Sequence, residues 1–173
     1  MHRIACFMSV LAVAPAVLSA QVNCGHTPCR DGAPQFEAYL AAPAPHAAPP
    51  APLVEDSRMA RRFRSVLRAG AATGPNFAGH YTVVTWGCGV ACAGLAIVDS
   101  ATGHAYFPQS LRFNDYHTVR ENPLPEPFQF RVDSSLLVIV GAPNEGDKSG
   151  IFYYVWKAPK LRLIYSDPRR WPF

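Results

Sequence analysis

Four cysteines are the residues of this chain whose spacing most directly suggests chemistry. They form two close pairs, Cys24 with Cys29 and Cys88 with Cys92. Such a pair can close a local disulfide, act as a redox pair or supply half of a zinc site. We expect the two local disulfides, because the oxidising compartment inferred below competes with zinc for the thiols. Two alternative pairings would join the N-terminal segment to the central loop, and the sequence leaves them open.

Three histidines, His80, His104 and His117, lie in the part of the chain expected to fold. A three-histidine metal site would need all of them to converge. Isolated histidines are more often surface or core polar groups, so we expect neither a metal nor another cofactor. Cys88, near His80, would suit a catalytic nucleophile only as a free thiol, and the expected disulfide with Cys92 excludes that.

Polar side chains gather on a long connection, residues 108–127. Loops of this length are either functional or packed against the domain. We treat Asp115, His117 and Arg120, together with His80, as candidate binding residues. The chain lacks a serine nucleophile elbow, an HExxH motif, a glycine-rich phosphate loop and an EF-hand pattern, so we assign no catalytic residue.

A predicted helix, from Ser57 to about Ala69, concentrates the positive charge. Its apolar residues follow a 3.6-residue period and form one face, and Gly70 is expected to end it. The apolar positions are Met59, Phe63, Val66 and Leu67, and the arginines on the other faces are Arg58, Arg61, Arg62, Arg64 and Arg68. We expect these arginines in solvent, and we take Arg61, Arg64 and Arg68 as candidate binding residues for an anionic lipid surface or an envelope polymer.

The elements that position these residues are mostly strands. The central stretch, residues 76–99, holds two strand candidates joined by the glycine-bracketed Cys88–Cys92 loop. We expect a mainly β fold with one N-terminal helix and about seven antiparallel strands, arranged as a two-sheet sandwich or a partly open barrel with propeller-blade-like meanders. The predicted strands are Tyr81–Trp86, Leu95–Val98, His104–Phe107, Phe128–Val132, Leu136–Val140, Ile151–Trp156 and Leu161–Tyr165.

One motif carries a resemblance. Asn76–Tyr81 reads NFAGHY, and after it come WGCGxxC ending at Cys92, an apolar run, Asp99 and Thr102-Gly103. This resembles the core pattern of a group of uncharacterised bacterial exported proteins, over roughly residues 61–107. The resemblance implies export and a bacterial envelope setting, and it implies no activity.

The N-terminus has the form of a signal peptide, residues 1–20. A short basic start precedes the apolar run Ile4–Leu18, which is too short to span a bilayer, and cleavage after Ala20 is expected. Residues 21–55 then form a cysteine-containing lead and an Ala/Pro-rich linker, either a free spacer or a strap along the domain, and residues 56–173 form a single β-rich domain. No later segment is apolar for long enough to cross a membrane, so we expect a periplasmic or secreted protein.

The overall charge excludes one class of partner. The 173 residues carry a net charge of +4, and the arginines of the predicted helix account for the excess. The rest of the chain is close to neutral, so we expect no nucleic-acid binding.

These observations give two functional hypotheses. The first is a non-enzymatic exported domain that binds a protein or an anionic polymer of the cell envelope. The alternative is a small periplasmic hydrolase that uses polar residues of the 110–121 loop with His80 or His104. The two differ in geometry, because the hydrolase requires these side chains to share one pocket.

Overall fold

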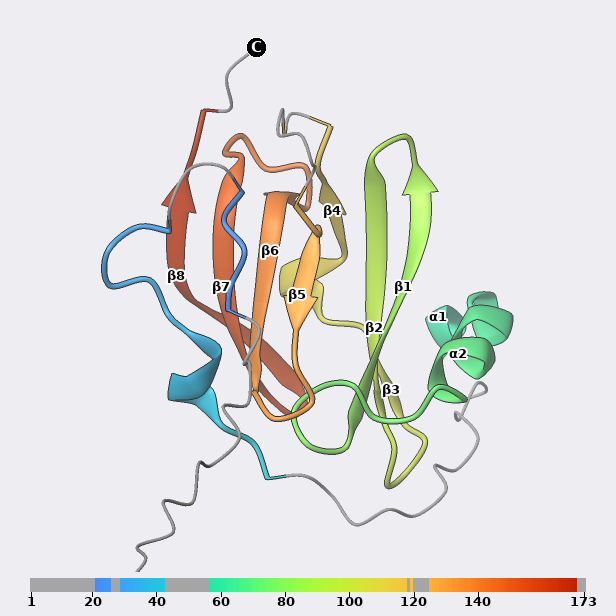
Figure 1. Ribbon diagram of the computed structural model, residues 1–173. Helices are drawn as coiled ribbons and strands as arrows, with labels where there is room; N and C mark the ends of the chain where they lie inside the picture. Colours follow the sequence, from blue (N-terminus) through green and yellow to red (C-terminus); the bar gives the residue numbers. More distant parts are fainter. Residues whose placement is uncertain (1–20, 26–28, 43–56, 118, 120–124, 171–173) are drawn as a thin grey trace, which may run out of the picture.

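The computed structural model describes residues 21–25, 29–42, 57–117, 119 and 125–170. Within these ranges the chain forms one open, mainly antiparallel sheet with few helices (Figure 1). The strands are β1 (Tyr81–Gly89), β2 (Cys92–Asp99), β3 (Ala105–Tyr106), β4 (Phe113–Asp115), β5 (Phe128–Phe130), β6 (Leu136–Pro143), β7 (Gly150–Lys157) and β8 (Lys160–Pro168). The helices are α1 (Arg58–Arg62) and α2 (Arg64–Ala71), with the 3-10 helices η1 (Phe36–Tyr39) and η2 (Gln109–Leu111). The predicted signal peptide and most of the Ala/Pro linker, residues 43–56, lie outside the described residues.

The short strand β4 joins the two halves of the sheet. The strand order is β1-β2-β4-β6-β7-β8, with β3 beside β2 and β5 beside β6. On one side β4 pairs with the start of β2, and on the other with the end of β6. The prediction of a mainly antiparallel β fold is confirmed, whereas a two-sheet sandwich or propeller blades are not. Sequence reasoning placed β4 inside a connection, because Phe113-Asn114-Asp115 shows no apolar alternation.

The sheet curls so that its halves share a buried core. Val83 and Ile97 on β1 and β2 belong to the same apolar cluster as Ile139 on β6 and Trp156 on β7. A second cluster lies on the opposite face of β6 and β7, and a third lies between α1, α2 and the outer face of β1 and β2. Apolar alternation along the strands therefore supplies two faces to cover, and the helices and the N-terminal lead cover them.

The NFAGHY motif closes the curl at one end. Its Asn76 side chain accepts a hydrogen bond from the Val83 N–H at 2.8 Å and donates one to the Val83 carbonyl at 3.2 Å. Ala78, at a φ of 45°, and Gly79 donate backbone hydrogen bonds to the turn between β5 and β6. Phe77 is fully buried in the shared core. The motif therefore holds the two halves of the sheet together at this end.

The single predicted helix is two short helices, α1 and α2, which meet at Phe63. Ser57 caps α1 as expected, because its Oγ accepts the Ala60 N–H at 3.0 Å. Phe63 then leaves helical geometry, with φ −102° and ψ 18°. The buried face also differs, since Met59 is 40% exposed and Ala60 is fully buried.

Gly70 does not end the helix, because it lies inside α2. A Cβ at this position would come within 2.6 Å of the Val84 side chain on β1. Because Gly70 has no side chain, α2 can lie close against the sheet at this point. The helices sit beside β1, on the side of the sheet away from β6 (Figure 1).

The N-terminal lead packs on the other half of the sheet. Val22, Cys24 and Phe36 are buried in the cluster on the faces of β6 and β7. Phe36 is 3% exposed, whereas Leu40 is 71% exposed and contributes a backbone bridge to Ser134.

Arg131 ties the lead to the turn between β5 and β6. Its guanidinium bonds Asp133 at 2.8 and 2.6 Å and Glu37, on η1, at 2.6 Å. The hydrogen bond from Arg131 lowers the pKa of Asp133, and Asp133 in turn raises the pKa of Arg131. No helix in the described residues is long and apolar enough to cross a membrane.

Candidate functional site

A cleft of about 730 Å³ lies between the segment that leads into η2 and the turn that joins β7 to β8. We call it the basic cleft. It is lined by Phe107, Pro108, Gln109, Ser110, Val155, Lys157, Pro159, Lys160, Leu161 and Arg162.

Strand register positions the cations of the basic cleft. Lys157 pairs with Lys160 across the β7–β8 turn. Val155 pairs with Arg162 two positions further from the turn, which is the next pair on the same face. Directly opposed residues of an antiparallel pair project from the same face, so the two pairs present their side chains next to each other. A two-residue connection, Ala158-Pro159, holds the lysines at the tip.

Hydrogen bonds hold the opposite wall, around η2. The Ser110 hydroxyl donates to the Leu161 carbonyl of β8 at 2.8 Å. Behind it, the Asn144 side chain accepts the Arg112 N–H at 2.7 Å and donates to the Ser110 carbonyl at 3.1 Å. The cleft is therefore built between fixed backbone segments, as preformed binding sites usually are.

The charge of the basic cleft has one sign. Lys157, Lys160 and Arg162 are exposed, and the lining contains no carboxylate. None of the ion pairs found among the described residues involves these three cations. The apolar part of the lining, which we call the floor, includes the half-buried Phe107 and the exposed Pro159. It also includes Val155 and Leu161, which are 6% and 5% exposed. An anion that enters would meet three cationic groups without displacing a carboxylate.

Helix α1 contributes to a cavity next to the basic cleft. A small cavity of about 80 Å³ shares Phe107, Pro108 and Gln109 with the cleft, and Met59 of α1 and Arg112 complete its lining together with Trp86, Leu95 and Leu111. The candidate residues Arg61, Arg64 and Arg68 are exposed on α1 and α2, as expected.

His80 and His104 lie together at one end of β2. His80 Nε2 is 3.7 Å from Asp99 Oδ1, and the Asp99 N–H donates to the His104 carbonyl at 2.9 Å. Each imidazole also packs on a tyrosine ring, His80 on Tyr81 and His104 on Tyr106. This end of the sheet is an aromatic cluster with one buried carboxylate.

Asp115 and His117 lie at the opposite end of β2. Asp115 pairs with Cys92 across the sheet, and its Oδ1 contacts His117 Nδ1 at 2.5 Å. Cys92 and Asp99 are the two ends of an eight-residue strand, so roughly 23 Å of extended backbone separates the two groups. No three His, Cys, Asp or Glu side chains among the described residues could together hold a metal ion. Arg120 lies outside the described residues.

Both disulfides have the local pairing. Cys24 bonds Cys29 and Cys88 bonds Cys92, with Cα separations of 5.2 and 5.1 Å. The alternatives that joined the lead to the central loop are therefore wrong. Because Cys88 is bonded, it is not a free thiol nucleophile.

The basic cleft was missed by sequence reasoning, although one signal was present. Lys157, Lys160 and Arg162 fall within six residues that contain no acid, a charge pattern that indicates a positive surface. The other wall, near Phe107 and Ser110, lies about fifty residues earlier in the chain, and only the fold brings it there.

No protein family, curated protein or solved structure matches this chain.

Proposed function

We propose that this chain is an exported, non-enzymatic binding module of the bacterial envelope, and that the basic cleft binds an acidic segment of a partner protein. One observation carries the proposal. Lys157, Lys160 and Arg162 share a lining with apolar residues and with no carboxylate. Cations that have no acidic neighbour complement an anionic partner and increase its rate of association.

The apolar floor favours a protein segment over a bare polyanion. Phe107 and Pro159 would stay uncovered beneath a polymer that offers only charged groups. A peptide with apolar and acidic side chains would cover the floor and meet the cations at the rim, which is the usual anatomy of a protein interface.

The two disulfides are compatible with a protein outside the cytoplasm, because oxidising compartments preserve such bonds. Export itself is part of the proposal, and it rests on the N-terminal sequence and on the resemblance described above.

The hydrolase alternative receives no support from the geometry. General acid–base catalysis needs groups within hydrogen-bonding reach of one substrate. His80 and His104 lie at one end of β2, and Asp115 and His117 lie at the other. The binding function is therefore the better reading of the structure.

Binding of a labelled peptide of alternating glutamate and leucine tests the proposal. We expect the triple variant Lys157→Gln, Lys160→Gln, Arg162→Gln to bind it about tenfold more weakly, because three charge–charge attractions are lost. A glutamine–leucine peptide and polyglutamate, measured on the unchanged chain, should both bind more weakly than the test peptide.

The matched control replaces Arg61, Arg64 and Arg68 by glutamine, which removes three cations from the helices and leaves the cleft intact. Both triple variants should keep their stability within about 1 kcal/mol, because all six side chains are exposed. The site assignment fails if the helix variant loses binding and the cleft variant does not. If the cleft variant loses binding and the helix variant keeps it, a pull-down from envelope extract with the unchanged chain would identify the natural partner.

A further inference from the structure

A second cleft, of about 430 Å³, lies between the β1–β2 hairpin and β5. We call it the aromatic cleft. It shares no lining residue with the basic cleft. Its lining is Thr85, Trp86, Gly87, Cys92, Ala93, Tyr116, Glu126, Pro127, Phe128 and Phe130.

One wall of the aromatic cleft is strand backbone with small side chains. Gly87 pairs with Ala93 across the hairpin, and a Cβ on Gly87 would meet no atom within 4 Å. The disulfide between Cys88 and Cys92 closes this hairpin just beyond the pair. The wall therefore has free space beside Gly87, and the disulfide holds the end of the hairpin together.

The other wall is aromatic and anchored in the sheet. Phe128 pairs with Ile139 on β6 and is 9% exposed. Phe130 packs edge-on against the buried Phe77, with ring centroids 6.2 Å apart. The Tyr116 N–H donates to the Ala91 carbonyl at 2.9 Å, which ties this residue to the hairpin. The rings are thus positioned before any ligand arrives.

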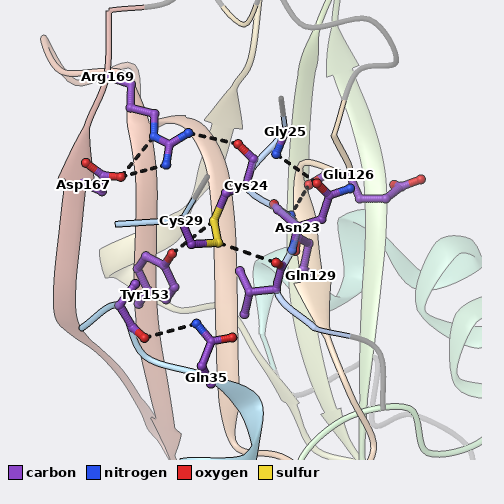
Figure 2. The surroundings of a disulfide bond; sticks show 12 residues. Asn23, Cys24, Gly25, Cys29, Gln35, Glu126, Gln129, Tyr153, Asp167 and Arg169 are labelled. Carbon is purple, nitrogen blue, oxygen red and sulfur yellow. Dashed lines mark hydrogen bonds and ion pairs between the residues drawn. A yellow bond between two sulfur atoms is a disulfide. The ribbon is translucent and has the colours of Figure 1, made fainter. Parts of the chain in front are cut away.

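Glu126 is the one charged side chain in the lining of the aromatic cleft. It is exposed, and among the hydrogen bonds of the described residues only its backbone carbonyl takes part, as acceptor from Gln129 Nε2 at 3.4 Å. In Figure 2 its carboxylate points away from the Cys24–Cys29 loop. A cation in the cleft would meet this carboxylate without competition from a lysine or arginine in the lining.

We propose that the aromatic cleft binds a small organic cation, an ammonium group carried on an apolar stem. Aromatic ring faces attract cations through their quadrupoles, and the attraction grows when the site excludes water. The Glu126 carboxylate adds a full negative charge, while Phe128, Phe130 and Pro127 cover the apolar stem. An anion would be repelled by the carboxylate, so the two clefts select opposite charges.

Titration with choline, followed by amide NMR, tests this inference. Its neutral isostere 3,3-dimethyl-1-butanol has the same shape without the charge. We expect saturable shifts at Gly87, Tyr116 and Glu126 with choline at millimolar concentration, and binding of the neutral isostere at least about fivefold weaker. Equal binding of the two compounds, or no saturable shift with choline, would overturn the inference.

Two variants locate the choline site, and a third serves as the control. Glu126→Gln removes the charge at an exposed position and should weaken choline binding by about tenfold. Gly87→Leu fills the open wall and should abolish the binding. Lys160→Gln, in the basic cleft, should leave it unchanged. The amide spectra of the free variants report whether each is folded, and unchanged affinity in a folded Glu126→Gln variant would refute the role of the carboxylate.

Discussion

Gly141 lies where the two halves of the sheet meet. Its φ is 141°, a region that favours glycine, and a Cβ there would come within 2.5 Å of the Asp115 carbonyl on β4. Beside it, Asn114 is fully buried, with Nδ2 donating to the Val140 carbonyl at 2.9 Å. At the scale of single residues, the junction therefore depends on Gly141, which has no Cβ to clash with β4, and on the buried side-chain amide of Asn114.

Alanine substitutions at two glycines test this dependence. Gly141→Ala should lower the free energy of unfolding by more than about 2 kcal/mol, because the new Cβ meets backbone atoms and the φ is strained. Gly87→Ala, where a Cβ meets open space, should change it by no more than about 0.5 kcal/mol. Equal effects in chemical denaturation would contradict the steric account of the junction.

At the scale of elements, the lead is held on the sheet by a buried ion pair at the end of β8. Arg169 donates to Asp167 Oδ2 at 3.0 and 2.9 Å and to the Cys24 carbonyl at 2.9 Å (Figure 2). Both partners are buried, with side chains 10% and 5% exposed. The Tyr153 hydroxyl lies 3.6 Å from Cys24 Sγ on the same side. Cys24 of the first disulfide thus packs against β7 and the end of β8.

Removing one partner of the Arg169–Asp167 ion pair should lower the free energy of unfolding more than removing both partners. Arg169→Met leaves the buried Asp167 carboxylate with only the exposed Arg30, 3.4 Å away, as a partner. This change should destabilise the fold by about 2 kcal/mol. The double variant Asp167→Asn, Arg169→Met removes both charges, so it should lose less stability than Arg169→Met alone. Thermal or chemical denaturation measures both, and a double variant less stable than the single one would contradict this explanation.

At the scale of the whole molecule, β7 separates two cores. Tyr153 points into the core under the lead, and Tyr154 points into the core between the sheet halves. Burial is the largest cause that raises the pKa of each phenol to about 12. Ionisation of either hydroxyl is therefore opposed by a different part of the fold.

Stability should fall in alkali for this reason. An unfolded tyrosine ionises near its ordinary pKa of 10.0, so between pH 10 and 12 the unfolded state releases protons that the folded state keeps. The contribution is complete below pH 10 and is lost as the pH rises through about 12, at most about 2 to 3 kcal/mol for each tyrosine. Tyr154→Phe should flatten this decline in denaturation curves measured from pH 8 to 12, and an equally steep decline would contradict it.

Local patterns were sufficient for several parts of this fold. Apolar runs such as Leu136–Val140 predicted strands, Ser57 predicted the start of a helix, and the spacing of Cys88 and Cys92 favoured a local disulfide. Each depends on neighbours a few residues away. The same reasoning placed Gly70 at a helix end, because it could not detect the close packing on Val84.

Sequence patterns alone predicted a mainly antiparallel β protein and an exposed set of arginines. They favoured two local disulfides without excluding the other pairings. Only contacts in the folded chain show that β4 joins the two halves of the sheet, that the lead packs on β6 and β7, and that the basic and aromatic clefts form. The difference comes from how far apart in the chain the interacting residues lie. Periodicity and spacing report which side chains are buried, whereas strand order, and with it the meeting of Ser110 with Leu161, depends on contacts between residues far apart in the chain.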